Sequence, residues 1–246
     1  MKDIDYRDRL YARYVKARER VLAPDTVNRL APRAPYLRRI IRLHFPEDRS
    51  AKILELGCGH GALLHFARRD GYMHARGVDT SPEQVAAADT LGVDDVEQGD
   101  LMQSLLDAAD ASLDVVVAFD VIEHLSKREL LDLVDQVHRV LRPGGRWIIH
   151  VPNGESPMFG RVRYGDFTHE LAFTRESIAQ LLLASGFSTV RCLEDTPVVH
   201  GAKSAIRWLI WKAMRAVLRL YVAAETGDSG KSAVFSQNLL AVATKT

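Results

Sequence analysis

The sequence predicts an α/β fold with a mostly parallel sheet and helices on both of its faces. Short apolar runs alternate with helical segments between residues 52 and 151, which is typical of right-handed βαβ units. These runs show little alternation of polar and apolar residues, as strands buried on both faces do. The chain has 246 residues, of which 47% are hydrophobic and 26% are charged, and this suits one well-packed domain.

The expected elements follow from local sequence signals. Five strands are expected at residues 53–56, 75–79, 95–98, 113–119 and 146–151, with helices at 62–69, 82–91 and 127–141. Ser81 and Pro82 form a favoured helix start, and Arg-Pro-Gly-Gly at 142–145 predicts a helix stop with a turn. Beyond them we expect a long functional loop at 152–169, a helix at 174–185 capped by Thr174, a strand at 188–193, a helix at 204–223 and a final strand within 234–244.

The chain is expected to form one domain, residues 1–246, in three parts. Residues 1–50 would form a helical cap, residues 51–151 the ligand-binding core, and residues 152–246 the substrate side. Prolines are expected to break the N-terminal helices, at Pro24, Pro32 and Pro35. The charged N-terminus lacks the apolar core of a signal peptide, and Cys58 and Cys192 form no disulfide framework, so we expect a cytoplasmic chain.

The charge is unevenly distributed along the chain, although the net charge is only +1. Residues 1–43 carry +7 and residues 203–246 carry +5, whereas the segment between them carries −11. Solvated helix faces would explain the basic ends. An anionic partner, such as phospholipid or a phosphorylated substrate, is the alternative.

Glycines and carboxylates stand where the predicted strands end. Gly57, Gly59 and Gly61 follow the first strand and lead into a helix, whose N–H groups and positive dipole end suit an anionic group. Asp79 ends the second strand, where a carboxylate can accept hydrogen bonds from both hydroxyls of a ribose, and Asp100 follows the third. Ligands of open α/β sheets bind outside the carboxyl ends of the strands, so a nucleotide-like ligand is expected there.

Five segments together resemble the class I S-adenosylmethionine (SAM)-dependent methyltransferases. They are Glu55-x-Gly57-x-Gly59-x-Gly61, Gly77-Val-Asp79-x-Ser81-Pro82, Gly99-Asp100, Phe119-Asp-Val-Ile-Glu-His124 and Leu141-Arg-Pro-Gly-Gly145. The resemblance is strong from residue 52 to 151 and looser outside. It implies a Rossmann-like, seven-stranded sheet with an antiparallel last strand, extra N-terminal helices and a C-terminal helical insertion.

The resemblance also implies SAM as the cofactor and S-adenosylhomocysteine as its product. The glycine loop would hold the methionine part of SAM, Asp79 the ribose and Asp100 the adenine. The expected cofactor-binding residues are Glu55, Gly57, Cys58, Gly59, Gly61, Asp79, Thr80, Asp100, Leu101, Phe119 and Asp120. No Asn/Asp-Pro-Pro-Tyr motif follows the fourth strand, which argues against a nucleic-acid base N-methylase and against a nucleic-acid partner.

The segments 120–125 and 164–174 resemble the small-molecule branch of these enzymes, which includes ubiquinone-pathway and polysaccharide-pathway O-methyltransferases. This predicts a hydroxyl acceptor, foremost a sugar of a glycan or of a lipid-linked glycan, with a quinone or phenol as the alternative. O-methylation needs a base with a pKa of about 7, which suits histidine. His169 is the first candidate, with Asp166 to orient it, and His124 is the second; either histidine would otherwise serve only local structure.

Further contacts of the acceptor are expected from outside the cofactor segments. Asn153 and Tyr164 are expected beside the substrate, and Tyr11 and Tyr14 are expected to form a lid. We expect no bound metal. A magnesium ion held by Asp120, Glu123 and His124 is the alternative, because carboxylate oxygens suit that ion.

The segment 204–221 combines tryptophans with four basic residues, too many charges for a membrane span. Such a helix suits the surface of a membrane, here the cytoplasmic face. Packing on the domain or on a second subunit of a homodimer is the alternative. Rival functions are an RNA or protein methyltransferase, a non-catalytic SAM-binding protein and, more distantly, a nicotinamide dehydrogenase.

Overall fold

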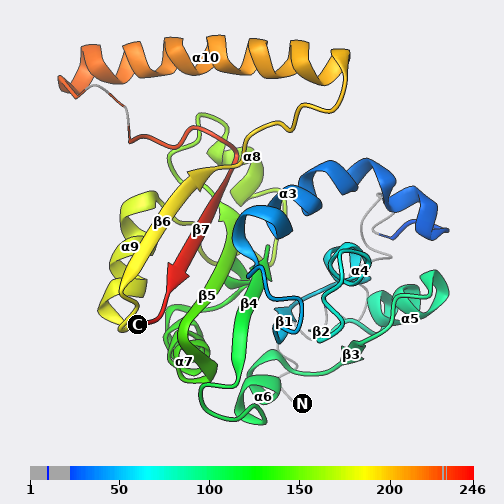
Figure 1. The fold of residues 1–246 in the computed structure, drawn as a ribbon. Coiled ribbons are helices and arrows are strands. Elements are labelled where there is room, and N and C mark those ends of the chain that lie inside the picture. The colour runs from blue at the N-terminus through cyan, green and yellow to red at the C-terminus, as the bar shows by residue number, and fades with distance from the viewer. Residues whose placement is uncertain (1–9, 11–22, 229, 231) are drawn as a thin grey trace, which may run out of the picture.

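The computed structural model describes residue 10, residues 23–228, residue 230 and residues 232–246, and its centre is a seven-stranded sheet (Figure 1). The strands are β1 (Ile53–Leu56), β2 (Ala75–Asp79), β3 (Val96–Gln98), β4 (Leu113–Phe119), β5 (Leu141–Pro152), β6 (Thr189–Glu194) and β7 (Asn238–Thr244). They lie in the order β3-β2-β1-β4-β5-β7-β6. The pairs among β1 to β5 are parallel, and β7 is antiparallel to both β5 and β6. The predicted mostly parallel sheet with an antiparallel last strand is confirmed.

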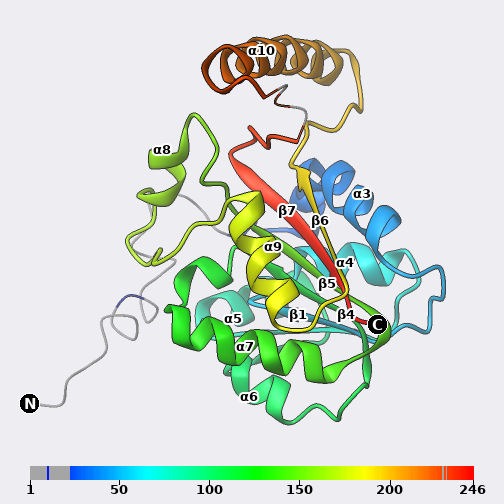
Figure 2. The same cartoon turned by 90° about the vertical axis from the view of Figure 1, so that its left-hand side faces the viewer.

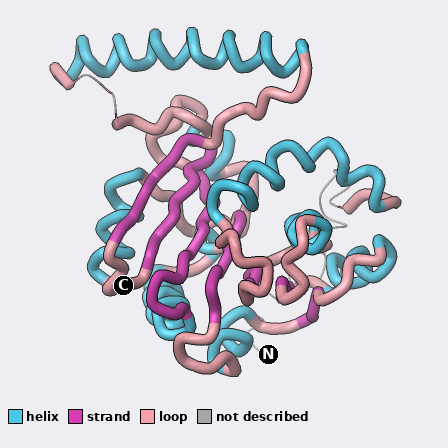
Figure 3. Tube along the Cα trace, viewed as in Figure 1, coloured by secondary structure: helices cyan, strands magenta, loops and turns pink. Residues whose placement is uncertain are grey.

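Helices alternate with the strands along the chain and cover both faces of the sheet (Figure 3). They are α3 (Ala34–His44), α4 (Ala62–Arg69), α5 (Pro82–Leu91), α6 (Leu101–Leu106), α7 (Lys127–Val140), α8 (Phe159–Arg163), α9 (Arg175–Ala184) and α10 (Ala202–Thr226), with 3₁₀ helices η1 (Val27–Arg33) and η2 (Ile122–His124).

Successive residues of the central strands feed two separate hydrophobic layers. Val115 and Val117 of β4 pack with residues of α3, α4 and α5, whereas Val116 packs with residues of α6, α7 and α9. Trp147 of β5 is completely buried in the second layer. Because both sides of these strands are covered, their sequences read as continuous apolar runs.

The predicted helix starts are confirmed by their hydrogen bonds. Ser81 accepts a hydrogen bond from the backbone N–H of Gln84 at the start of α5. Thr174 and Ser177 form a reciprocal capping box at the start of α9. Side-chain oxygens at these positions satisfy N–H groups that a helix cannot satisfy within its first turn.

Several expected boundaries were wrong. Pro32 lies inside η1, and Pro35 lies within the first two positions of α3, where a helix does not use the N–H that proline lacks. Neither proline interrupts its helix. The turn expected at residues 142–145 is part of β5, since Gly144 N–H donates to Lys245 and Lys245 N–H donates to Gly145. The loop expected at 152–169 contains α8, and the helix α6 was not predicted.

The topology puts α10 at the same edge of the sheet as the expected ligand site. β6 ends at the carboxyl edge of the parallel strands and β7 begins there, and α10 is inserted between these two strands. Among the described residues, no helix has the length and the apolar character that a membrane span requires.

Candidate functional site

The glycine loop after β1 is shaped by close contacts with its neighbours. Gly57 has φ +65°, and a Cβ there would lie 2.5 Å from Cγ2 of Val121, so only glycine fits. Gly59 has φ +57°, but a Cβ there would meet only Gln84, at 3.7 Å. No side chain caps the start of α4. The loop is thus held against β4 at Gly57 and open at Gly59, where a ligand can approach the backbone.

Asp79 fastens this loop to the end of β2. Its Oδ2 atom accepts a hydrogen bond from Gly59 N–H at 2.7 Å, and its Oδ1 atom accepts one from Ser81 N–H at 2.8 Å. Burial raises the pKa of Asp79, while these two N–H groups lower it. Each carboxylate oxygen can accept a second hydrogen bond, so Asp79 fits the expected ribose contact. Thr80, beside it, is exposed.

Asp100 caps the helix that follows β3. Its Oδ1 atom accepts a hydrogen bond from Gln103 N–H at 2.8 Å and so caps α6. The residue is exposed at the end of β3, and the next residue, Leu101, is partly buried against the core. The adenine contacts expected of Asp100 and Leu101 stay predictions.

The fit of SAM to this loop is tested best by Glu55, whose side chain has a buried oxygen without a partner. Glu55 is 4% exposed and its Oε2 atom accepts no hydrogen bond. Burial raises the pKa of this carboxyl group to about 8. A buried acceptor without a partner is costly, and the ammonium group of a bound methionine moiety would satisfy it. The residues therefore fit the cofactor that the sequence predicts.

Cys58 packs closely within the loop, and its thiol is not ionised. It is buried, and burial raises the pKa of its thiol far above the ordinary value. A Cβ added to Gly77 would lie 2.6 Å from Cβ of Cys58, which shows how closely β2 approaches the loop. Contact between Cys58 and the cofactor stays a prediction.

An ion pair joins the ends of β4 and β5. The Nδ1 atom of His150 lies 2.8 Å from Oδ1 of Asp120, and its Nε2 atom lies 3.5 Å from Oδ2 of Asp195. Burial alone would lower the pKa of His150, but Asp120 and Asp195 raise it to about 10. Burial would raise the pKa of Asp120, yet His150 lowers it overall. At neutral pH His150 is therefore a cation and Asp120 an anion, and His150 cannot serve as a general base.

Two aromatic rings lie beside His150, whereas the Asp120 side chain is 59% exposed. The rings of Phe119 and Tyr36 lie 5.4 Å and 6.4 Å from that of His150, centre to centre. Burial, and then Asp195, raise the pKa of Tyr36 well above its ordinary value, so its hydroxyl stays protonated. Sequence reasoning missed His150, Asp195 and Tyr36. A histidine at the end of an otherwise apolar strand was the signal that could have identified the first of them.

A second cluster brings together residues far apart in the chain. The backbone carbonyl of Glu123 accepts hydrogen bonds from Glu170 N–H and Leu171 N–H, at 2.7 and 2.8 Å, which draws this loop against η2. The rings of His124 and His169 then lie 4.7 Å apart, and Nε2 of His169 lies 4.0 Å from Oε1 of Glu123. The two histidines proposed as bases thus belong to one site.

Glu123 gives this cluster its unusual electrostatics. Its side chain is completely buried, and neither carboxylate oxygen has a hydrogen-bond partner. Burial, and then the nearby Asp120, raise its pKa well above the ordinary value. Such a group is stable either with a proton of its own or beside a cation.

Hydrogen bonds through Thr168 orient His124. The Thr168 hydroxyl donates to Oδ1 of Asp166 at 2.7 Å and lies 2.8 Å from Nδ1 of His124. A hydroxyl has one proton, so Nδ1–H of His124 donates to Thr168, and in the neutral ring Nε2 carries the lone pair. Asp166 was expected to orient His169; these bonds link it to His124, and its role toward His169 stays a prediction.

The same cluster has the donors of a metal site. One ligand atom from each of Glu123, His124 and His169 lies within 4.8 Å of the others. Two imidazoles and a carboxylate suit zinc or another transition ion better than magnesium. The magnesium set considered from the sequence contained Asp120 instead of His169.

The remaining predicted substrate residues differ in their surroundings. Asn153 is completely buried, and its amide donates to the carbonyls of Val234 and Ser236 while accepting from Glu155 N–H. Because these bonds occupy the Asn153 amide, its expected contact with the acceptor stays a prediction. Tyr164 is 76% exposed after α8 and stays a prediction. Tyr11 and Tyr14 lie outside the described residues.

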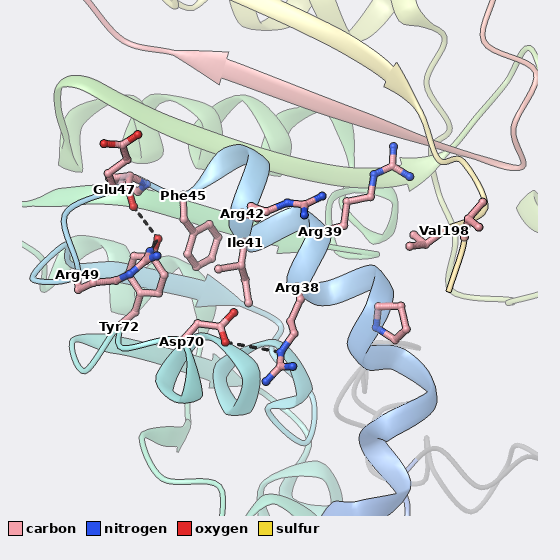
Figure 4. A pocket seen from close by; sticks show the side chains of 13 residues that line it. Arg38, Arg39, Ile41, Arg42, Phe45, Glu47, Arg49, Asp70, Tyr72 and Val198 are labelled. Atoms are coloured by element: carbon pink, nitrogen blue, oxygen red, sulfur yellow. Dashed lines mark hydrogen bonds and ion pairs between the residues drawn. The ribbon is translucent and has the colours of Figure 1, made fainter. Parts of the chain in front are cut away.

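A cavity of about 790 Å³ lies beside α3 (Figure 4), and its lining includes no residue of the glycine loop or of either cluster. Its lining includes Arg38, Arg39, Arg42 and Arg49. Arg38 pairs with Asp70 at 3.6 Å and Arg49 stacks on Tyr72. None of the residues expected to bind the cofactor lines this cavity, so we assign it no part in the site.

Comparisons with known proteins agree with this geometry. A family profile described as a methyltransferase domain matches residues 14–191. A protein of Mycolicibacterium smegmatis described as a probable S-adenosylmethionine-dependent methyltransferase is 35% identical over 156 residues, which cover 61% of this chain and 56% of that protein. An O-methyltransferase of Aspergillus sclerotiorum is 29% identical over 180 residues, which cover 66% of this chain and 63% of that protein.

The matched relatives include N-methyltransferases as well as O-methyltransferases. The chain spans about half to two thirds of the length of the first curated relatives it matches. Among solved structures, a SAM-dependent methyltransferase from Archaeoglobus fulgidus aligns with a TM-score of 0.65 and 20% identity, over 88% of this chain and 94% of that chain. That likeness establishes the fold.

Proposed function

Since this chain belongs to the class I SAM-dependent methyltransferases, we propose that it methylates a hydroxyl group of a small molecule, foremost a sugar of a glycan or of a lipid-linked glycan. The observation that carries the proposal is the buried Glu123–His124–His169 cluster, which lies one turn beyond Asp120 at the carboxyl edge. In this proposal one of the two imidazoles takes a proton from the hydroxyl group, a step that O-methylation requires and that SAM cannot perform.

The glycine loop and its carboxylates bind the cofactor in this proposal. SAM supplies a methyl group that is already strongly electrophilic. Glu55 accepts a hydrogen bond from the ammonium group of the methionine part of SAM, and Asp79 accepts hydrogen bonds from the ribose hydroxyls. The protonated His150 keeps Asp120 ionised beside them. These residues orient the cofactor rather than activate it, so most of the catalysis comes from alignment.

Proton removal falls to the histidine cluster. His169 is the first candidate base and His124 the second, with Thr168 and Asp166 holding the His124 ring. The buried carboxylate of Glu123 stabilises a histidine that has gained a proton, because opposite charges attract strongly where water is excluded. A base of this kind contributes about 10²- to 10⁴-fold to the rate.

The test compares acceptor-dependent formation of S-adenosylhomocysteine across sugars, phenols and amines. We expect turnover with a hydroxyl acceptor. His169→Ala should lower kcat about 100-fold or more while SAM binding, measured by calorimetry, is unchanged. His65→Ala, a change of a half-buried histidine on α4, is the matched control and should leave kcat within about twofold.

Near-normal turnover in both His169→Ala and His124→Ala would contradict the proposal that a histidine is the general base. Turnover with amines alone would contradict O-methylation. A positioning role for Thr168 is tested by Thr168→Val, which should lower kcat with little change in KM, and by Thr168→Ser, which should restore it.

A further inference from the structure

Helix α10 stands apart from the rest of the molecule. Figures 1 and 2 show it above the carboxyl edge of the sheet, reached by one chain segment from β6 and left by another toward β7. Of its residues, Ser204 alone is buried. Its inner side is fastened by Arg215, whose Nε donates to Oε1 of Glu194 at 2.6 Å. Most helices in proteins are stabilised by packing of an apolar face, so a 25-residue helix with this little packing indicates a further contact that stabilises it.

The outer side of α10 is apolar from Ile206 to Tyr221, with exposed basic residues at its borders. Seven large apolar residues are 57 to 71% exposed, namely Ile206, Leu209, Ile210, Met214, Val217, Leu220 and Tyr221. Their spacing of three and four residues puts them on one face. The half-buried residues Trp208, Trp211, Arg215 and Leu218 repeat in the same way on the opposite, inner face. Soluble monomers rarely expose a contiguous row of apolar side chains of this length, and such a face indicates a partner.

All charges of α10 between residues 203 and 224 are positive, and Glu225 in its last turn is negative. Five basic residues flank or oppose the apolar face, namely Lys203, Arg207, Lys212, Arg215 and Arg219, and no acidic residue occurs between residues 203 and 224. Arg207 and Lys212 are exposed, at opposite borders of the apolar face, and Lys212 also contacts the Trp208 ring. Two copies of this helix brought face to face would set like charges against each other. An anionic surface with an apolar interior would satisfy both features.

We propose that α10 binds the surface of an anionic lipid bilayer, with its outer face among the acyl chains and with Arg207 and Lys212 at the lipid headgroups. The helix then lies parallel to the membrane, and the carboxyl edge of the sheet, with the glycine loop and both clusters, faces the bilayer. The proposal does not depend on the acceptor, because binding to lipid requires no methyl transfer.

The test is cosedimentation of the full chain with vesicles of phosphatidylglycerol and phosphatidylcholine, and with vesicles of phosphatidylcholine alone. We expect binding to the first, weakened by salt, and about tenfold or more weaker binding to the second. The double variant Leu209→Asp, Val217→Asp should remain in the supernatant. Leu131→Asp, which changes a 49% exposed leucine on α7, is the matched control and should sediment like the parent.

The basic residues are tested separately. Arg207→Gln with Lys212→Gln should weaken binding to the anionic vesicles about 25-fold, whereas Lys127→Gln with Arg128→Gln on α7 should not. Circular dichroism checks that each variant is folded. Failure of the parent chain to sediment with anionic vesicles would overturn the proposal. So would a dimer in light scattering that the Leu209→Asp, Val217→Asp variant converts to a monomer, since the apolar face would then cover a second copy.

Discussion

His150 and Asp120 are connected twice, through their side chains and through the backbone. The Nδ1 atom of His150 lies 2.8 Å from Oδ1 of Asp120, and the N–H of Asp120 donates to the carbonyl of His150 at 2.9 Å. Asp120 has φ +55°, a conformation that costs a non-glycine residue about 1 kcal/mol or more. The double connection holds this strained turn at the end of β4, beside the expected cofactor.

Replacing His150 should destabilise the protein in a pH-dependent way. Its pKa of about 10 in the folded protein exceeds the ordinary histidine pKa of 6.5, so its contribution is complete below about pH 6.5 and is lost as pH rises through about 10. His150→Gln should therefore lower the free energy of unfolding by about 1.5–3 kcal/mol at neutral pH and by less near pH 10. Urea unfolding over this range measures it, with His65→Gln as control. A loss of unfolding free energy in His150→Gln that does not change with pH would contradict the ion pair.

Glu55 should release a proton when SAM binds. With a pKa of about 8, the carboxyl group is about nine-tenths protonated at pH 7, and it must ionise to pair with an ammonium group. Affinity for SAM should therefore rise from about pH 6 to about pH 7.5. Calorimetry in buffers of different ionisation enthalpy should show close to one proton released at pH 7, and almost none for Glu55→Gln. The same release from Glu55→Gln as from the parent would assign the proton elsewhere. Glu97→Gln, at an exposed carboxylate of β3, is the control.

Alanine substitutions at Gly57 and Gly144 distinguish the cost of backbone strain from the cost of steric overlap. Both have positive φ, but a Cβ at Gly57 would lie 2.5 Å from Val121, whereas one at Gly144 would meet nothing within 4 Å. Gly144→Ala should cost about 1–2 kcal/mol of stability and leave SAM binding unchanged. Gly57→Ala should cost about 1–3 kcal/mol more and also weaken SAM binding. Thermal unfolding and calorimetry measure the two effects. Equal losses from the two variants would show that the contact with Val121 is unimportant.

Metal removal distinguishes a histidine base from a metal site at Glu123, His124 and His169. If the histidines act as bases, dialysis against a chelator should leave turnover within about twofold of the untreated protein. Loss of turnover that zinc or manganese restores, together with binding of one ion per chain in the absence of SAM, would contradict the base and assign the cluster to a metal.

Features that depend on neighbouring residues could be predicted from the sequence. The glycine loop, the Asp79 position and the caps at Ser81 and Thr174 are all fixed by chemistry within a few residues. The parallel order of the central strands follows from their alternation with helices. The helix α6 was missed because its six residues are too few for a clear periodicity.

Features that depend on long-range packing could not be predicted. Asp120, His150 and Asp195 meet only because β4 and β5 pair in one register and the segment after β6 returns beside them. Thr168 reaches His124 across 44 residues, and nothing local to Asp166 indicates that link. Nor does the amphipathic pattern of residues 204–221 by itself show that α10 would stand clear of the domain.

Binding of SAM tests the central claim most directly. Calorimetry on the full chain should show one SAM per chain, competition by S-adenosylhomocysteine and no binding of NAD. Asp79→Asn should weaken the affinity for SAM at least about tenfold. The two carboxylate oxygens of Asp79 accept hydrogen bonds from Gly59 and Ser81, whereas an asparagine amide has only one acceptor oxygen, so it cannot also accept the ribose hydroxyls in the same way. No SAM binding by the folded chain, or binding of NAD in its place, would contradict the claim.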